Sequence, residues 1–395
     1  VGSEMCIRDR IAIGGAHAST FAGEILSHNN AIDFILRGEY ELSLLKLAKF
    51  MRNSEEELPK GVVCRENGKI IDKGLPSLID PLDILPFPAR DIFPSNDYSD
   101  ISVYWDGFCQ VYPAIQIHSS RGCPYRCYFC LWNQAIYNNG KYRTFNPNRV
   151  VDEIEEVITK YGAREVYFDD DNFTISKFHV FSICSEIIKR NLSIKWSCMG
   201  DAINLDEEMI DNMAKSGCIG IKFGVESASN KILKTIGKPV NLKKVREVAK
   251  LCRKYKIKSH ATFMLGLLGE TEKDMMETLK FAQDLKVDSL QISIATPLPG
   301  TKFFSLVEKK GFLRSKDWSL FDGKVSEIIS YPDLDWRKVE KMRRRGLLLW
   351  FLRKIIVPSE IFSWCCIIIR TLRGLGIHIF FKKTFSIIID EFKNR

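Results

Sequence analysis

Three cysteines lie close together in the segment RGCPYRCYFC, as Cys123, Cys127 and Cys130. Three thiolates can bind three irons of a cubane cluster, which leaves the fourth iron open to bind and reduce another molecule. A purely electron-carrying cluster normally has four protein ligands. The spacing CxxxCxxC therefore predicts a 4Fe-4S cluster with one open iron.

A structural zinc site is the alternative for the same cysteines, because zinc also binds cysteine sulfur. Such a site needs a fourth ligand, for which Cys109 and His118 are the candidates. Zinc sites favour pairs of the form CxxC over a triplet, so the cluster is the preferred interpretation.

Alternating strands and helices are predicted from residue 109 to about residue 305, a pattern typical of a parallel sheet flanked by helices. Six units are too few for a complete eight-fold barrel, so we expect an α/β fold with a partial (βα)6 barrel and its site at the carboxyl ends of the strands. The six predicted strands are AIQIH, REVYFDD, LSIKWSC, CIGIKFG, KSHATFML and SLQISIA.

The helix that follows the first strand has unusually complete local signals. Asn146 can cap it, Pro147 suits its first turn, and Gly162 can end it. Apolar residues recur on one face between these positions, which predicts an amphipathic helix packed on the sheet.

The segment CPYRCYFC, with Phe129 before the last cysteine, resembles the signature of the radical S-adenosylmethionine (radical SAM) superfamily. The resemblance implies that the open iron binds SAM and that one electron from an external donor cleaves it to a 5′-deoxyadenosyl radical. In such enzymes the cofactor performs the difficult chemistry while the protein positions it.

Other segments resemble the family at the expected strand ends, namely FDDDNFT, FGVES, MLGLLGET and TPLPGT. Leu268 stands where the family usually has proline and Gly200 where it often has arginine, so SAM or substrate contacts could differ here. Aspartates after a strand also commonly only cap the next helix. The resemblance implies that SAM contacts Asp170 and Asp171 at its methionyl end, Glu226 and Ser227 toward the ribose, and Leu265, Gly266 and Gly269 at the adenine. It also implies that Phe129 contacts SAM.

The front of the chain resembles the distal half of a Rossmann-like cobalamin-binding domain, through GGAHAS and the later FILRGEYE. Gly14 and Gly15 would let a ligand approach the backbone, and His17 could reach the same cleft. A plain strand-to-helix turn with His17 on the surface is the alternative. With both segments present, we expect cobalamin as a cofactor of the full-length protein.

These features favour cobalamin-dependent methylation of an unreactive carbon. Radical cyclisation, oxidation or rearrangement in cofactor or lipid biosynthesis is the alternative, and a zinc-stabilised nucleic-acid-binding module is a distant one. A methylthiotransferase is less favoured, because residues 11–108 offer only Cys64 for a second cluster. The expected partners are a small-molecule or lipid substrate and an electron donor, without nucleic acid.

The composition is that of a folded protein, with 45% hydrophobic and 27% charged residues. The net charge of +9 is concentrated in residues 331–395, which hold 14 Lys and Arg against 6 Asp and Glu. We expect this tail to form domain-packing helices or to lie on an anionic membrane surface, without crossing it. Scattered cysteines without an apparent secretion signal indicate a cytoplasmic enzyme, in peripheral membrane contact if the tail lies on a membrane.

The chain is thus expected to have five parts. Residues 1–10 resemble an adaptor-derived artefact, which would make the chain an N-terminally truncated fragment. The other parts are the end of a cobalamin-binding-like domain (11–51), a linker (52–108), the radical SAM core (109–330) and the basic helical tail (331–395).

Overall fold

The computed structural model describes residues 10–52, 57–92, 108–137 and 140–356. The artefact expected at residues 1–10 lies outside this range except for Arg10, and so does the tail beyond residue 356. Residues 1–340 form one compact unit, and a second unit begins at Lys341.

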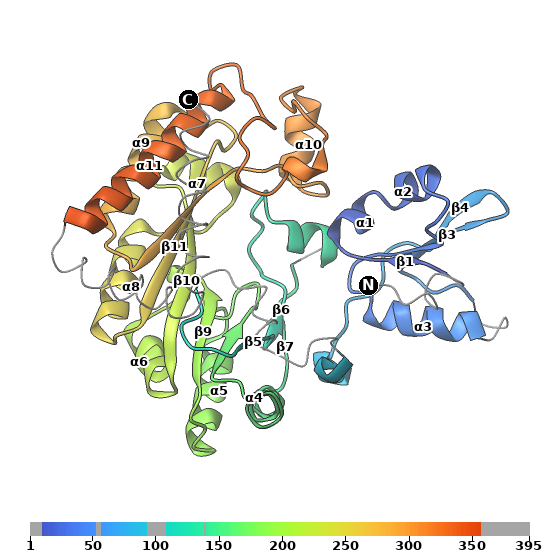
Figure 1. Cartoon of the computed structure of the whole chain (residues 1–395), viewed down its shortest axis with the longest axis horizontal. Coiled ribbons are helices and arrows are strands. Elements are labelled where there is room, and N and C mark those ends of the chain that lie inside the picture. Colours follow the sequence, from blue (N-terminus) through green and yellow to red (C-terminus); the bar gives the residue numbers. More distant parts are fainter. Residues whose placement is uncertain (1–9, 53–56, 93–107, 138–139, 357–395) are drawn as a thin grey trace, which may run out of the picture. The chain divides into compact units, whose positions relative to one another are not determined.

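A six-stranded parallel sheet forms the core of the first unit (Figure 1). Its strand order is β12-β11-β10-β9-β8-β5, so every strand pairs with its nearest neighbours along the chain. In the described residues β5 and β12 are the two edges, which makes this an open, partial barrel as predicted. The strands are β5 (Ala114–Ile117), β8 (Glu165–Phe168), β9 (Lys195–Gly200), β10 (Cys218–Glu226), β11 (Lys258–Leu265) and β12 (Ser289–Ile294).

Helices follow the strands and cover the apolar face of the sheet. The prediction for the first of them is confirmed: α4 spans Pro147–Tyr161, the Asn146 side chain accepts a hydrogen bond from the backbone N–H of Asn148, and Gly162 ends the helix with φ 64°. The others are α5 (Lys177–Lys189), α6 (Glu207–Lys215), α7 (Asn230–Ile236), α8 (Leu242–Lys254), α9 (Glu272–Asp284) and α10 (Lys302–Lys309).

The front of the chain forms a separate four-stranded sheet of order β1-β2-β3-β4. As expected, β1 (Ala12–Ile13) and β2 (Phe34–Leu36) are parallel, and helices α1 (Ala16–Thr20), α2 (Ala22–His28) and α3 (Glu41–Arg52) accompany them. The strands β3 (Val62–Glu66) and β4 (Lys69–Asp72) form an antiparallel hairpin that pairs with β2. Residues 62–72 thus differ from the linker expected over 52–108, because they complete this sheet.

The predicted basic tail begins with α11 (Trp336–Ile356). None of the helices in the described ranges is long and apolar enough to cross a membrane.

Candidate functional site

The cysteine triplet lies in the loop between β5 and α4, at the carboxyl edge of the parallel sheet. The short antiparallel pair β6 (Ser120–Arg121) and β7 (Arg143–Thr144) brings the start and the end of this loop together. We call residues 122–131 the cysteine loop. Its position at the end of the first strand of the sheet is the one that the sequence predicts.

Two carboxylates that follow β8 accept hydrogen bonds from the residues at and just before the start of the cysteine loop. Asp170 is buried and accepts hydrogen bonds from the Ser119 N–H (2.7 Å), the Ser119 hydroxyl (2.5 Å) and the Ser120 hydroxyl (2.8 Å). Asp171 accepts one from the Gly122 N–H at 2.8 Å. Burial raises the pKa of Asp170 to about 6 against the effect of these hydrogen bonds. Asp170 therefore holds the two serines that precede the cysteine loop, and the SAM contact expected for it stays a prediction.

A single π-helical turn, Trp132–Ile136, follows the cysteine loop and donates hydrogen bonds to its backbone. The Asn133 side-chain amide donates to the carbonyls of Cys123 (2.8 Å) and Tyr125 (2.7 Å). The Gln134 amide donates to the carbonyls of Cys127, Tyr128 and Cys130 at 2.8–3.2 Å. Such turns occur often at functional sites, and this one fixes the backbone of all three cysteines.

Three later segments of the chain form hydrogen bonds with Tyr128 of the cysteine loop. The Tyr128 N–H donates to the Ile236 carbonyl (2.9 Å), and the Phe303 N–H donates to the Tyr128 carbonyl (3.0 Å). The Tyr128 hydroxyl accepts from the Leu268 N–H at 3.1 Å. The cysteine loop is therefore bound directly to the segment after β11, which the sequence associates with adenine.

The Lys238 side chain is 13% exposed, and its charge acts on all three thiols. Lys238 forms an ion pair with Asp201 (2.8 Å), and a Cβ on Gly224 would lie 3.2 Å from its Nζ and 2.3 Å from Glu226 Oε1. Burial raises the pKa of Cys123 to about 11 and that of Cys127 to about 12, and the Lys238 charge opposes both shifts. The positive charge thus favours the thiolates that iron requires.

Glu226 and Ser227 lie in different surroundings, although they are adjacent in sequence. Glu226 has φ 65° at the end of β10, and burial raises its pKa to about 7 against the nearby Lys238 charge. The Ser227 hydroxyl lies 3.2 Å from the Thr278 hydroxyl and accepts from the Ser229 N–H at 3.1 Å. Glu226 therefore faces the charged group around Lys238, whereas Ser227 is engaged within the fold.

The buried carboxylate of Glu270 binds the backbone of the loop that follows β11. Gly266 has φ 81° and Gly269 has φ 80°, and one Glu270 oxygen accepts from the N–H groups of Gly266 (2.6 Å) and Leu267 (3.0 Å). Leu265, the last residue of β11, is buried, and Phe129 packs next to Tyr128 at a ring distance of 6.1 Å. The hydrogen bond between Leu268 and Tyr128 joins this loop to the cysteine loop.

Gly14, Gly15 and His17 lie on the front sheet, after β1. A Cβ on Gly14 would lie 3.0 Å from the Tyr40 ring, so the two segments that resemble a cobalamin-binding domain contact each other. Gly15 has φ 104°, and a Cβ there would meet no described atom within 4 Å, whereas His17 stacks edge-on against Phe21 and Trp318. The helix α1 begins here, and its Thr20 hydroxyl reaches the Pro299 carbonyl of the TPLPGT loop at 3.5 Å.

The front sheet is also tied to the cysteine loop by a carboxylate that sequence reasoning missed. Glu39, from the RGEYE segment, is buried and accepts from Arg143 at 2.8 and 3.0 Å, from Arg121 at 3.2 Å and from the Ile79 N–H at 2.9 Å. Arg121 and Arg143 belong to the strand pair that flanks the cysteine loop. The partners are 82 and 104 residues away in sequence, so no local pattern could have identified them.

No group of three His, Cys, Asp or Glu side chains in the described residues is arranged to hold a single metal ion. The cysteine loop carries three thiols, and three thiolates are the ligands that three irons of a cubane take.

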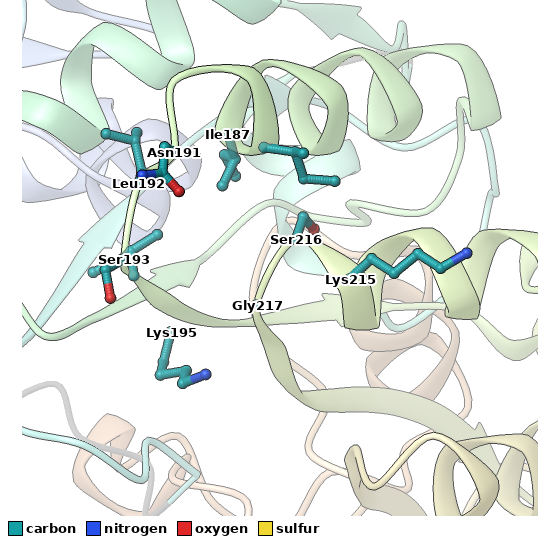
Figure 2. A pocket seen from close by; sticks show the side chains of 10 residues that line it. Ile187, Asn191, Leu192, Ser193, Lys195, Lys215, Ser216 and Gly217 are labelled. Carbon is teal, nitrogen blue, oxygen red and sulfur yellow. The ribbon is translucent and has the colours of Figure 1, made fainter.

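A surface pocket lies elsewhere, between the turn after α5 and the turn after α6 (Figure 2). Its lining residues lead into the amino ends of β9 and β10. Since the cysteine loop is at the carboxyl edge, this pocket is not part of the candidate site.

The Radical SAM superfamily matches residues 117–282, which include the cysteine loop and the strands β8 to β11. Residues 117–282 are thus a radical SAM domain, and the chain is an enzyme, as the sequence predicts.

Several relatives extend the radical SAM match beyond the core. An uncharacterized methyltransferase of Pyrococcus horikoshii is 29% identical over 92% of this chain and 77% of its own length. The cytidylyl-2-hydroxyethylphosphonate methyltransferase of Streptomyces wedmorensis is 27% identical over 82% of this chain and 65% of its own length. The chain thus spans only part of these relatives.

A solved structure has the same fold as this radical SAM chain. The radical SAM methyltransferase TsrM of Kitasatospora setae, with cobalamin and a [4Fe-4S] cluster bound, superposes with a TM-score of 0.62 at 18% identity. The match covers 85% of this chain and 64% of TsrM.

A substitution of Gln134 tests whether its hydrogen bonds hold the cysteine loop in place. We expect Gln134→Leu to lose about 2–3 kcal/mol of unfolding free energy and most of the bound iron, because three carbonyls lose their donor. Gln134→Glu keeps the acceptor for the Lys302 N–H (2.7 Å) but lacks the donor, so it should lose iron as well. Iron content after anaerobic reconstitution is the measurement, and full iron binding in both variants would contradict the role.

Glu270 predicts a pH dependence of stability. Burial raises its pKa to about 8 in the folded chain, from 4.5 when unfolded. The folded chain therefore holds more protons between these values, and its unfolding free energy falls as the pH rises through this window. We expect Glu270→Gln to reduce that fall by about 1–3 kcal/mol, measured by urea unfolding on both sides of the window. An unchanged slope would contradict the assignment.

Proposed function

We propose that the protein transfers a methyl group to an unreactive carbon of a small molecule, using a 4Fe-4S cluster, SAM and cobalamin. The observation that carries this proposal is the cysteine loop, which presents three thiols beside Lys238 and is bound to the loop after β11. The methyl transfer itself rests on the relatives that are named as methyltransferases.

Cys123, Cys127 and Cys130 would hold the cluster. Asp170, Asp171, Asn133 and Gln134 fix the loop that carries them. When bound, the cluster supplies the electron that cleaves SAM to a 5′-deoxyadenosyl radical, and cobalamin supplies the methyl group. The residues of this chain orient these groups and maintain the charge around them.

SAM would lie between the cysteine loop and the ends of β10 and β11. Phe129, Glu226 and the turn from Leu265 to Gly269 border this region, and Asp171 borders it from β8. Lys238, Asp201 and Glu226 place charges of both signs there, which suits the ammonium and carboxylate of a methionyl group. Ser227 is proposed only as a support for this edge.

Cobalamin would bind at the carboxyl end of β1, at Gly14, Gly15 and His17. Gly15 leaves the backbone open to a ligand, whereas the Tyr40 ring packs against Gly14. Support comes from the contact of α1 with the TPLPGT loop, which follows the last strand of the core. This arrangement would bring the two cofactor sites toward the same edge of the sheet.

Anaerobic reconstitution with iron and sulfide, followed by SAM and a reductant, tests the proposal. We expect 5′-deoxyadenosine to form, and with methyl-labelled SAM and added cobalamin we expect the label on cobalamin. An intact cluster without 5′-deoxyadenosine would refute the radical reaction. Radical cleavage without any labelled cobalamin would favour cyclisation, oxidation or rearrangement instead.

A further inference from the structure

The end of α7 packs directly on the cysteine loop. The Ile236 carbonyl accepts a hydrogen bond from the Tyr128 N–H (2.9 Å), and the Cys127 thiol lies 3.9 Å from the Gly237 carbonyl. Gly237 has φ 67°, and a Cβ there would lie 3.0 Å from a backbone carbonyl of the cysteine loop. The bare glycine therefore allows this close approach, and the next residue, Lys238, follows it beside the thiols.

The Lys238 ammonium is held in place by its surroundings. It pairs at 2.8 Å with Asp201, whose side chain is buried and whose backbone N–H donates to the Thr174 hydroxyl at 2.8 Å. A Cβ on Gly224 would lie 3.2 Å from Lys238 Nζ, so the lysine lies against the bare backbone of β10. Burial alone would lower the pKa of Lys238, but the charges of Asp201 and Glu226 raise it above its usual value. The side chain therefore carries a permanent positive charge at a fixed position.

This positive charge acts on the whole cysteine loop. Burial raises the pKa of each of the three thiols, and the charge of Lys238 opposes the rise at every one of them. Charges that are enclosed by protein are screened less by salt than exposed charges are. Lys238 would therefore act on any group that the three thiols hold, and more strongly than a lysine on the surface.

A fixed charge beside an iron–sulfur cluster changes how readily the cluster is reduced. One-electron reduction adds one negative charge to the cluster, and net charge and solvent exposure are among the properties that set its reduction potential. A nearby cation stabilises the more negative, reduced form and raises the potential, whereas a nearby anion lowers it. Lys238 and Asp201 should therefore have effects of opposite sign.

We propose that the Lys238–Asp201 ion pair sets the reduction potential of the cluster, with Lys238 raising the potential and Asp201 lowering it. The step concerned is the transfer of one electron from an external reductant to the cluster, in which no bond forms or breaks. The inference rests on the proposed function only in taking the cysteine loop as the holder of the cluster. It concerns the cluster before SAM binds, so it is separate from any contact of the same charges with a methionyl group.

A redox titration of the anaerobically reconstituted full chain with dithionite, without SAM, tests the inference. The cluster absorbance measures the ratio of reduced to oxidised cluster at each applied potential. We expect Lys238→Met to lower this ratio about tenfold at a fixed potential, which is a shift of about 59 mV for one electron. Asp201→Asn should raise the ratio by a similar factor. Lys238→Arg should keep the potential of the unaltered chain, and the double variant Lys238→Met with Asp201→Asn should return close to it.

Lys234→Met is the matched control, because Lys234 lies one turn earlier, on α7, and is exposed. Its charge is screened by solvent, so the potential should not change. An unchanged potential in Lys238→Met would overturn the inference. Shifts of the same sign in Lys238→Met and Asp201→Asn would also overturn it, because a general disturbance of the site, unlike a charge effect, does not depend on the sign of the charge removed.

Two further comparisons keep the result decisive. If Lys238→Met binds no cluster, Asp201→Asn is compared with the double variant, because these two differ only at Lys238, and equal potentials would overturn the inference. An unaltered chain that binds no cluster would refute the proposed function and the inference with it. A cluster with the expected shifts but without formation of 5′-deoxyadenosine from SAM would refute the proposed function alone.

Discussion

Replacement of Cys127 by alanine is expected to abolish iron binding and SAM cleavage. The same result is expected for Cys123→Ala and Cys130→Ala, because each thiol would bind a different iron and no other protein sulfur can replace it within the stapled loop. After anaerobic reconstitution, the unaltered chain should bind about four irons and the variants far fewer. Iron and sulfide content, with the cluster absorbance, measures the effect.

Cys252→Ala is the matched control for these variants. Cys252 is fully buried in α8 and behaves as a small apolar side chain. It should retain the cluster and lose only about 1 kcal/mol of unfolding free energy. If a loop variant kept full iron content while Cys252→Ala lost it, the assignment of the ligands would be wrong.

Glu39→Gln is expected to destabilise the chain by about 3–5 kcal/mol. The reason is that the guanidinium groups of Arg121 and Arg143 would lose the buried carboxylate that neutralises them. Arg143 is 2% exposed at its side chain, so water cannot replace the lost charge. Since both arginines flank the cysteine loop, iron binding should fall with stability. Urea unfolding and iron content measure the two effects.

Glu41→Gln is the matched control, since it removes a second carboxylate of the same RGEYE segment. Glu41 pairs with Arg121 at 2.6 Å but is 39% exposed. Exposed ion pairs contribute about 0–1 kcal/mol, so this variant should bind iron normally. Equal losses in both variants would show that Glu39 has no special role.

Much of the parallel sheet follows from local patterns. All six strands lie where the apolar runs predict them, and α4 begins and ends at its capping residues. The signal was strong because each strand is buried on its helix-facing side. The fold class of the core is confirmed for the same reason.

The hairpin β3–β4 was hidden by the proline-rich segment around it. Its turn is nonetheless recognisable in the sequence, because Asn67 and Gly68 have φ 49° and 76° between two short apolar runs. An Asn-Gly pair in that setting is the strongest local signal for a two-residue hairpin turn. This pair therefore marks residues 62–72 as two strands rather than as linker.

The candidate site likewise has one part that the sequence predicts and one part that only the folded chain reveals. The cysteines were recognisable because their chemistry depends on spacing along the chain. Glu39 and Lys238 were not, because their roles depend on partners that only the folded chain brings near. Asp170 illustrates the difference, since a carboxylate directly after a strand is equally suited to binding a ligand or holding a loop.

The strand order of the parallel sheet has a consequence for biosynthesis. The cysteine loop follows the first strand of that sheet, whereas Lys302 and Phe303, which bond to Gln134 and Tyr128, follow the last. A ribosome therefore releases all three cysteines well before the segment that closes over them. Iron and sulfide delivered during translation would therefore meet a cysteine loop that still lacks the hydrogen bonds from residues 302 and 303.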